Sequence, residues 1–175
     1  NTSTAEKIDS SLIANNRSDV NRRHATYNVN YAWRTKEKSI SIDADYGEFD
    51  NKGNYYQPNI YFDTNNNVLA SSNANKYNTA NNIQISSIKL DSEFPSKIGK
   101  LGAGIKLSQV RTENKFLFSN ILNQIPVQNS HRSNFFDYRE NVYAAYINYS
   151  KMLTKKWSLT SGLRAEQTDA TGDLT

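Results

Sequence analysis

The chain has 175 residues, of which 37% are hydrophobic and 11% aromatic, with no cysteine and a formal net charge of +4. Its 11 tyrosines and 7 phenylalanines argue against disorder, because disordered chains are poor in aromatic residues. No segment approaches the roughly 20 apolar residues of a transmembrane helix. The absence of cysteine excludes disulfides and thiolate metal sites. The small net positive charge is spread along the chain, and no nucleic-acid-binding motif accompanies it, so we expect no nucleic-acid partner.

The first regular pattern is a strict alternation of apolar and polar residues over 27–34, which resumes over 40–47. Successive side chains of a strand point to opposite faces, so both segments are predicted to be strands with one apolar face. A turn at 35–38 would place Trp33 opposite Ile40 and Tyr27 opposite Tyr46. Every apolar residue then shares one face, and a one-residue slip would destroy that agreement.

The same alternation predicts two further hairpins, with turns near 95–98 and 152–155. In the second hairpin, we expect Glu93 to face Lys100 as a cross-strand ion pair. In the third, two sets of apolar residues compete over 142–149. We prefer the set with Tyr143 and Ile147, because Asn148 then falls on the polar face. The six predicted strands cover residues 24–34, 39–48, 83–94, 99–111, 137–151 and 156–168.

The connections between the hairpins, residues 49–81 and 112–136, are predicted to be long polar loops. The first is rich in asparagine, which is typical of turns and exposed loops. Short turns therefore alternate with long connections along the chain. Within the long connections, residues 55–62 and 115–118 could extend the strands or form small hairpins.

Six antiparallel strands with one apolar face fit two architectures. A soluble sandwich or small barrel would turn the apolar face inward, whereas a transmembrane β-barrel would turn it toward lipid. Strands of about 9 to 11 residues and the alternation of short turns with long loops favour the transmembrane barrel. Aromatic residues that cluster at two levels along the strands also favour the transmembrane barrel, because aromatic residues are enriched at both membrane interfaces. The level beside the short turns would hold Trp33, Phe94, Tyr149 and Trp157, and the other would hold Tyr27, Tyr46, Phe49 and Tyr138. The predicted fold class is an all-β, antiparallel up-and-down meander that forms six strands of a larger transmembrane β-barrel.

Residues 136–150 (FDYRENVYAAYINYS) and 156–166 (KWSLTSGLRAE) resemble the barrel region of the Bacteroidetes outer-membrane β-barrel family, relatives of TonB-dependent receptors. Residues 27–33 and 41–46 are similar to an upstream hairpin of that barrel. The resemblance covers most of residues 21–170. It implies that residues 1–175 are a fragment of a single outer-membrane β-barrel domain of a Gram-negative cell envelope. It also implies a signal peptide, a carboxypeptidase-regulatory-like domain and a plug upstream, and further strands downstream.

The function that this resemblance implies is the binding or uptake of an extracellular nutrient, dependent on TonB in the full-length protein. The implied partners are outer-membrane lipid, an unknown extracellular ligand and an inner-membrane energy-coupling protein that acts through a plug absent from this chain. We expect the loops 49–81 and 112–136 to contact the ligand. Two alternatives stay open. One is a soluble extracellular or periplasmic β-domain that binds a protein or glycan, and the other is a structural outer-membrane barrel without transport.

The chain shows no pattern typical of an enzyme. Its two histidines, His24 and His131, lack neighbouring residues at metal-ligand spacing. Many serines decorate the strands, but neither histidine lies on a convincing strand, so no Ser-His pair can be nominated. We therefore expect no catalytic residue, no cofactor and no metal site.

Two local pairs could suggest chemistry, but each has a simpler explanation. Asp43 and Asp45 share one strand face, where a carboxylate pair more often holds water or pairs with lysine than acts as acid and base. Gly102 and Gly104 alternate within a strand and lack the strand-to-helix setting of a phosphate loop. We expect these glycines to relieve crowding in a curved wall.

Overall fold

The computed structural model describes residues 10–70 and 72–175. It contains one antiparallel sheet of eight strands in the order β1-β3-β4-β5-β7-β8, with β2 beside β3 and β6 beside β5. This confirms the predicted all-β meander. The strands are β1 (Ser10–Ile13), β2 (Arg17–Arg34), β3 (Ser39–Asp63), β4 (Asn73–Ser96), β5 (Gly99–Leu122), β6 (Ile125–Gln128), β7 (Asn134–Met152) and β8 (Ser158–Leu174).

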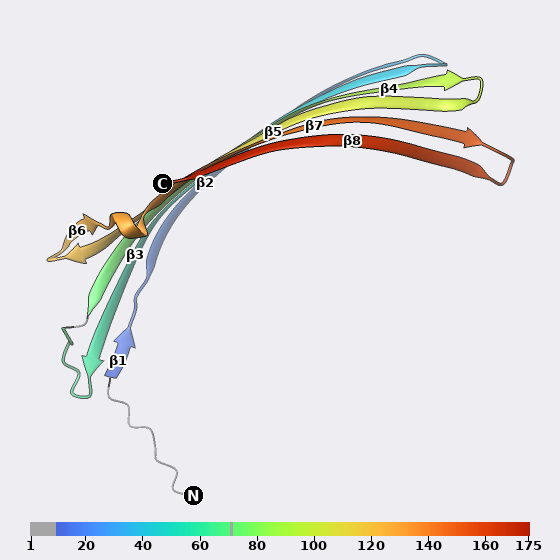
Figure 1. Ribbon diagram of the computed structural model, residues 1–175. Helices are drawn as coiled ribbons and strands as arrows, with labels where there is room; N and C mark the ends of the chain where they lie inside the picture. Colours follow the sequence, from blue (N-terminus) through green and yellow to red (C-terminus); the bar gives the residue numbers. More distant parts are fainter. Residues whose placement is uncertain (1–9, 71) are drawn as a thin grey trace, which may run out of the picture.

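The sheet forms a long, curved and twisted wall (Figure 1). The tight turns β2–β3, β4–β5 and β7–β8 lie at one end, whereas β1, the β3–β4 connection and β6 lie at the other. The helical element is the short 3-10 helix η1 (Ser130–Arg132). In the part of the chain that the structure describes, no helix is long and apolar enough to cross a membrane. Phe118 and Ala144 are the only buried apolar residues there, so this wall encloses no core of its own.

The register of the first hairpin is confirmed, with Trp33 opposite Ile40 and Tyr27 opposite Tyr46. Thr35 closes its turn, because its backbone N–H donates to the Lys38 carbonyl at 2.8 Å and its hydroxyl accepts from the Lys38 N–H at 2.9 Å. In the third hairpin, the preferred apolar set of β7 lies on the apolar face of β8, because Ala145 pairs with Ala165 and Ile147 with Leu163. The pattern of alternation was therefore sufficient to select the face.

The predicted ion pair between Glu93 and Lys100 is wrong. Glu93 lies opposite Gly102, two residues further along β5 than predicted. The hairpin reverses over a tip of two residues, 97–98, followed by Gly99, which has a φ of +154° that side-chain-bearing residues rarely adopt. Because the shift is two residues, each apolar side chain still lies on its predicted face.

The strands are much longer than predicted. β3 has 25 residues, and β4 and β5 have 24 each. Most of the segments 49–81 and 112–136, predicted to be long loops, therefore belong to strands, and the extension through 55–62 and 115–118 is confirmed. The long connections reduce to the segment between β3 and β4 and to residues 129–133, which include η1. Between β5 and β6, the tip at Asn123 and Gln124 has positive φ angles of 49° and 66°, which suit a two-residue hairpin turn. The prediction of loops failed because the alternation of apolar and polar residues continues in both segments. Its apolar residues, however, lie on the face of the sheet opposite to the apolar face of residues 40–46.

Pairing between the parts of β3 and β4 that lie farthest from the tight turns can be tested by an engineered disulfide, because this chain has no cysteine. Asn54 lies opposite Asn78, and their side chains hydrogen-bond to each other. Directly opposed residues are close enough for a disulfide. We expect N54C/N78C in the full-length protein to cross-link under mild oxidation, as a mobility shift on non-reducing gels. The control N54C/T79C, with its second cysteine on the other face, should not. Equal cross-linking of both pairs would mean that this segment is a mobile loop.

Candidate functional site

One face of the sheet carries a continuous apolar band near the tight turns. Its side chains are exposed even on central strands, with 38% of Ile42, 46% of Ile105 and 58% of Ile147 accessible. At about 3.3 Å per residue, the seven residues 40–46 cover about 23 Å, close to the roughly 25 Å apolar band of transmembrane barrels. The apolar band consists of Tyr27, Val29, Tyr31, Trp33, Ile40, Ile42, Ala44, Tyr46, Ile88, Leu90, Phe94, Leu101, Ala103, Ile105, Leu107, Tyr143, Ala145, Ile147, Tyr149, Trp157, Leu159, Leu163 and Ala165.

The apolar band runs obliquely across the strands. On β3 its edge farthest from the tight turns is Tyr46, whereas on β8 it is Ala165, which shares a row of the register with Ile42. This is a shift of four residues over the four strand spacings from β3 to β8, which corresponds to a tilt of about 35° at roughly 3.3 Å per residue and 4.8 Å per strand. Strands of transmembrane barrels tilt by about 35–45°. The obliquity is what tilted strands crossing a flat membrane require.

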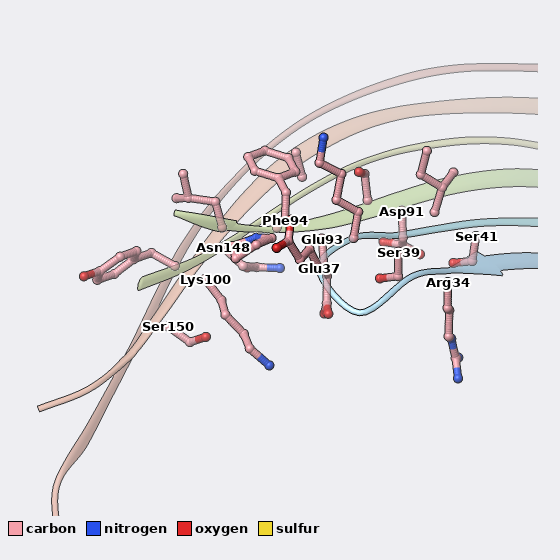
Figure 2. Close-up of a pocket in the computed structure, with 18 of the residues that line it drawn as sticks. Arg34, Glu37, Ser39, Ser41, Asp91, Glu93, Phe94, Lys100, Asn148 and Ser150 are labelled. Atoms are coloured by element: carbon pink, nitrogen blue, oxygen red, sulfur yellow. The ribbon is translucent and has the colours of Figure 1, made fainter. Parts of the chain in front are cut away.

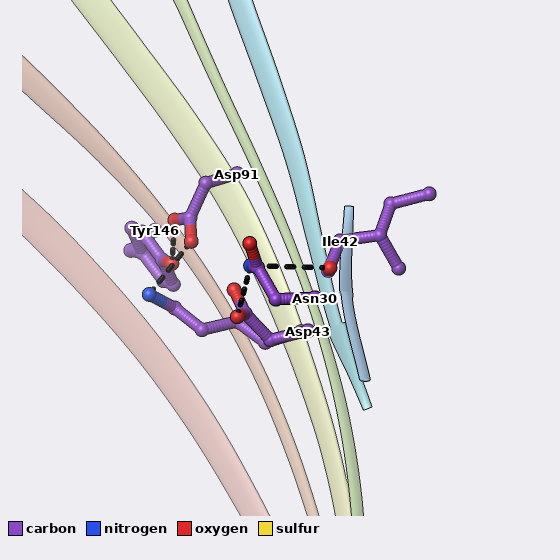
Figure 3. A network of polar contacts seen from close by, with 6 residues as sticks. Asn30, Ile42, Asp43, Asp91 and Tyr146 are labelled. Carbon is purple, nitrogen blue, oxygen red and sulfur yellow. Dashed lines mark hydrogen bonds and ion pairs between the residues drawn. The ribbon is translucent and has the colours of Figure 1, made fainter. Parts of the chain in front are cut away.

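The opposite face, at the height of the apolar band, carries a polar network (Figure 3). The Asn30 amide donates to Asp43 at 2.5 Å, and the Asn28 amide donates to Asp45 at 2.6 Å. The Ser87 hydroxyl also donates to Asp45, at 3.1 Å. The two aspartates that were predicted to share a face do so, and each accepts from an amide on the neighbouring strand.

Tyr146 is the centre of a second part of this network. Its hydroxyl donates to Asp91, which also forms an ion pair with Lys89 at 2.6 Å. The Tyr146 ring lies between two cations, with Lys89 Nζ at 6.0 Å and the Arg164 guanidinium at 5.9 Å from its centroid. Arg164 is in turn paired with Glu166 at 2.5 Å. Charges of both signs therefore alternate on this face, as suits a hydrated interior.

Beside the tight turns, the polar face is hollowed into a groove (Figure 2). Residues of six strands, β2, β3, β4, β5, β7 and β8, and of the β2–β3 turn line it. Arg34 and Lys100 supply positive charge, and Asp91 and Glu93 supply negative charge. The groove therefore presents charges of both signs on the polar face.

Glycine is required at one of the two positions singled out in β5. A Cβ at Gly104 would lie 2.4 Å from Cζ of Tyr146, whereas a Cβ at Gly102 would meet nothing nearer than 3.7 Å. Gly104 therefore makes room for the ring at the centre of the network, and Gly102 does not have that role. The expectation that both relieve crowding holds for Gly104 alone.

Beyond the apolar band, the apolar residues change face. In β3, Phe49 has the parity of Asp43, whereas Asp50 has the parity of Tyr46. Tyr138 in β7 likewise faces the side of the polar network, because it shares its parity with Tyr146. The prediction that Phe49 and Tyr138 belong to the second aromatic level is therefore wrong, and Tyr27 and Tyr46 remain at that level.

The residues that follow on the polar-network side form an aromatic wall across β3, β4 and β5. We define the aromatic wall as the odd positions of 49–57 and 75–83 and the even positions of 112–120. At its centre, Tyr55 stacks on Tyr77 with ring centroids 4.6 Å apart, and Tyr77 lies 5.8 Å from Phe116. The Arg132 guanidinium lies 3.6 Å from the centroid of Phe118 and covers the end of this ladder. None of the fifteen positions of the aromatic wall is Asp, Glu, Lys or Arg.

Two rows of amides flank the aromatic ladder. Side chains in each row oppose one another across β3, β4 and β5, and the rows are Asn51, Asn81, Asn114 and Gln57, Asn75, Asn120. Oδ1 of Asn51 is buried and has no hydrogen-bond partner among the described residues. On the neighbouring strand β7, the Tyr138 hydroxyl donates to Glu140 at 2.5 Å, and this hydrogen bond raises the pKa of Tyr138. The aromatic wall thus combines ring surfaces with neutral donors and acceptors.

The two histidines lie apart in the fold. His24 stacks on Phe49 with ring centroids 5.9 Å apart, and His131 is in η1. Within residues 10–70 and 72–175, no group of three His, Asp or Glu side chains could hold a metal ion. His24 lies in β2, so the prediction that neither histidine is on a strand is wrong for His24.

The aromatic wall is the part of the site that the sequence prediction missed. Its signal is present as aromatic residues spaced by two, such as Phe116 and Phe118, but on the parity opposite to the apolar band. When apolar residues are sought at positions of one parity only, the alternation ends where the aromatic wall begins. The segment that follows is then interpreted as a loop. A search for a change of parity would have found the aromatic wall.

Comparison with known proteins gives one match. The sequence model of an outer membrane protein beta-barrel family matches residues 31–175. No curated protein matches the chain.

The two glycines of β5 make a matched test of the polar network. Replacing Gly104 with Ala should displace the Tyr146 ring and weaken its contact with Asp91, at a cost of about 1–3 kcal/mol in the free energy of unfolding. Replacing Gly102 with Ala should change that free energy by less than about 0.5 kcal/mol. Urea unfolding of the full-length protein in detergent measures both. Similar losses for the two variants would contradict the role assigned to Gly104.

Proposed function

Because this chain belongs to an outer membrane protein β-barrel family, we propose that it is the wall of a receptor barrel that binds an extracellular nutrient and takes it up. The protein is located in the outer membrane. Short turns of such barrels face the periplasm, and their longer connections face outward. The tight turns β2–β3, β4–β5 and β7–β8 are therefore periplasmic, and the aromatic wall stands outside the membrane on the lumen side.

The aromatic wall is the observation that carries the proposal. Residues 47–63 of β3 continue for about 55 Å beyond the apolar band at about 3.3 Å per residue. This extension brings the aromatic wall to the side from which an extracellular ligand arrives. The ligand-contact regions are thus the outer halves of β3, β4 and β5, which occupy much of the segments 49–81 and 112–136 predicted as loops.

The chemistry of the aromatic wall favours an uncharged ligand with both polar groups and apolar faces. Stacked rings such as Tyr55 and Tyr77 offer apolar surface, and the flanking amides both donate and accept hydrogen bonds. The unpaired Oδ1 of Asn51 would gain a donor from such a ligand. A charged ligand would find no opposite charge on these fifteen positions.

The finer parts of the proposal are energised uptake and its partners. The resemblance of residues 136–150 and 156–166 to relatives of TonB-dependent receptors supports coupling to an inner-membrane protein, and a plug would carry this coupling. We assign no enzymatic role to the chain. The second candidate is a structural barrel without transport, and it gives the aromatic wall no purpose.

Uptake by cells distinguishes these two candidates. A strain that lacks the full-length protein is compared with its parent on limiting carbon, vitamin and iron-chelate sources. We expect uptake of at least one source to be lost, and its uptake in the parent to stop when a protonophore abolishes the proton gradient. Unchanged uptake of every source, with increased sensitivity of the envelope to detergent, would favour the structural barrel.

Two neighbouring tyrosines, Tyr77 and Tyr56, lie on opposite faces of the sheet and allow a test of where the ligand binds. Replacing Tyr77 with Ala removes a ring from the centre of the aromatic wall, so we expect the KM for uptake of the identified nutrient to rise about five- to thirtyfold. Tyr56 faces outward and is 42% exposed, so Tyr56→Ala is the matched control and should leave KM unchanged. Equal effects of the two substitutions would contradict ligand contact at the aromatic wall.

A further inference from the structure

The three tight turns at the periplasmic end carry a concentration of lysine. We call this set the lysine rim, and its members are Lys36, Lys38, Lys97, Lys151, Lys155 and Lys156. All six are exposed, and none forms an ion pair with any residue that the structure describes. Glu37 is the only acidic residue among the tips of these turns. The lysine rim and Glu37 contribute +5 to a formal net charge of +4, so the rest of the chain is close to neutral.

The lysine rim borders the apolar band directly. Lys151 in β7 has the parity of Tyr149, so it points to the lipid-facing side, whereas Lys36 and Lys38 belong to the β2–β3 turn, which also lines the groove. Lys155 and Lys156 immediately precede Trp157, which is 72% exposed. Tryptophan at this level is typical of the interface between hydrocarbon and headgroups. The lysine rim is therefore at headgroup depth.

The outward face at the other end of the sheet has a different charge pattern. There, positive and negative residues are mixed, and some of them pair along a strand, as Arg111 does with Glu113 at 3.8 Å and Arg139 with Asp137 at 3.5 Å. Mixed charges of this kind would be sufficient to solvate either end of the sheet. The outward face at the end away from the tight turns is therefore mixed in charge, whereas the tips of the tight turns combine the six lysines with one acidic residue, Glu37.

We propose that the lysine rim binds the phosphate groups of anionic phospholipids in the periplasmic leaflet of the outer membrane. The aliphatic part of a lysine can lie along apolar surface while its ammonium group reaches the headgroups. Basic residues beside a membrane attract anionic lipid, and the attraction weakens with salt. Bound lipid headgroups would fix the depth of the tight turns. This inference rests on membership of the family and not on the identity of the nutrient.

The test compares two triple variants of the full-length protein purified in detergent. K38Q/K151Q/K156Q removes three charges from the lysine rim, and K52Q/K76Q/K115Q removes three exposed charges from the lipid-distal part of the same outward face. Native mass spectrometry measures binding of phosphatidylglycerol and phosphatidylethanolamine to each protein. The wild type and the distal variant should prefer phosphatidylglycerol. The rim variant should lose about fivefold in affinity for it for each lysine engaged.

Four results would overturn the proposal. One is a wild type without preference for phosphatidylglycerol, and another is a preference that the rim variant retains. The third is an equal loss in both triple variants, which would mean a response to overall charge. Glycerol phosphate added at the concentration of the lipid should not displace it. Displacement would assign the lysine rim to soluble phosphates or acidic partners rather than to a lipid surface.

Discussion

The hydrogen-bonded register between neighbouring strands is the constraint on which the rest of the structure depends. In lipid, every backbone N–H and C=O must pair within the protein, so the strands cannot slip or separate. A fixed register also fixes which side chains share a face, because a shift by one residue would exchange the two faces completely. The oblique apolar band, the polar network and the aromatic wall all follow from the continuous pairing of β2 with β3 through to β8. The same constraint requires partners for the outer edges of β2 and β8, which closure of a barrel would supply.

Each long strand passes from lipid into water along its length, and its apolar side chains change from the outward to the inward face accordingly. Within the membrane, the outside of the wall is lipid and the inside is wet, so Ile42 points outward and Asp43 inward. Beyond the membrane the outside is water, so Asp50 points outward and Phe49 inward. One uninterrupted strand can therefore hold a lipid-facing surface and, further along, an inward surface with rings and amides. The rings and amides therefore belong to the same strands as the lipid-facing surface.

Much of this fold could be predicted from the sequence, because local alternation reports directly on strand faces. The pairing of Trp33 with Ile40 followed from one turn and one apolar face. The position of Glu93 could not be fixed in the same way, because two registers that differ by two residues give the same faces, and only the geometry at Gly99 selects between them. The outer strand halves were mistaken for loops because asparagine is common both in loops and in amide rows such as Asn51 and Asn81. Pairing over such distances is a tertiary property that composition does not reveal.

The change of face along a single strand is the central claim, and β5 allows a direct measurement. Nitroxide labels placed one at a time at positions 101–118 of the full-length protein in bilayers report collisions with oxygen, which partitions into lipid, and with a water-soluble nickel chelate. We expect the odd positions to collide with oxygen through Leu107 and with the chelate at Glu113 and Lys115. The even positions should change from wet at Lys106 to shielded at Phe116. A single unchanged pattern from 101 to 118, or odd positions near Ile105 that are open to the chelate, would contradict the account.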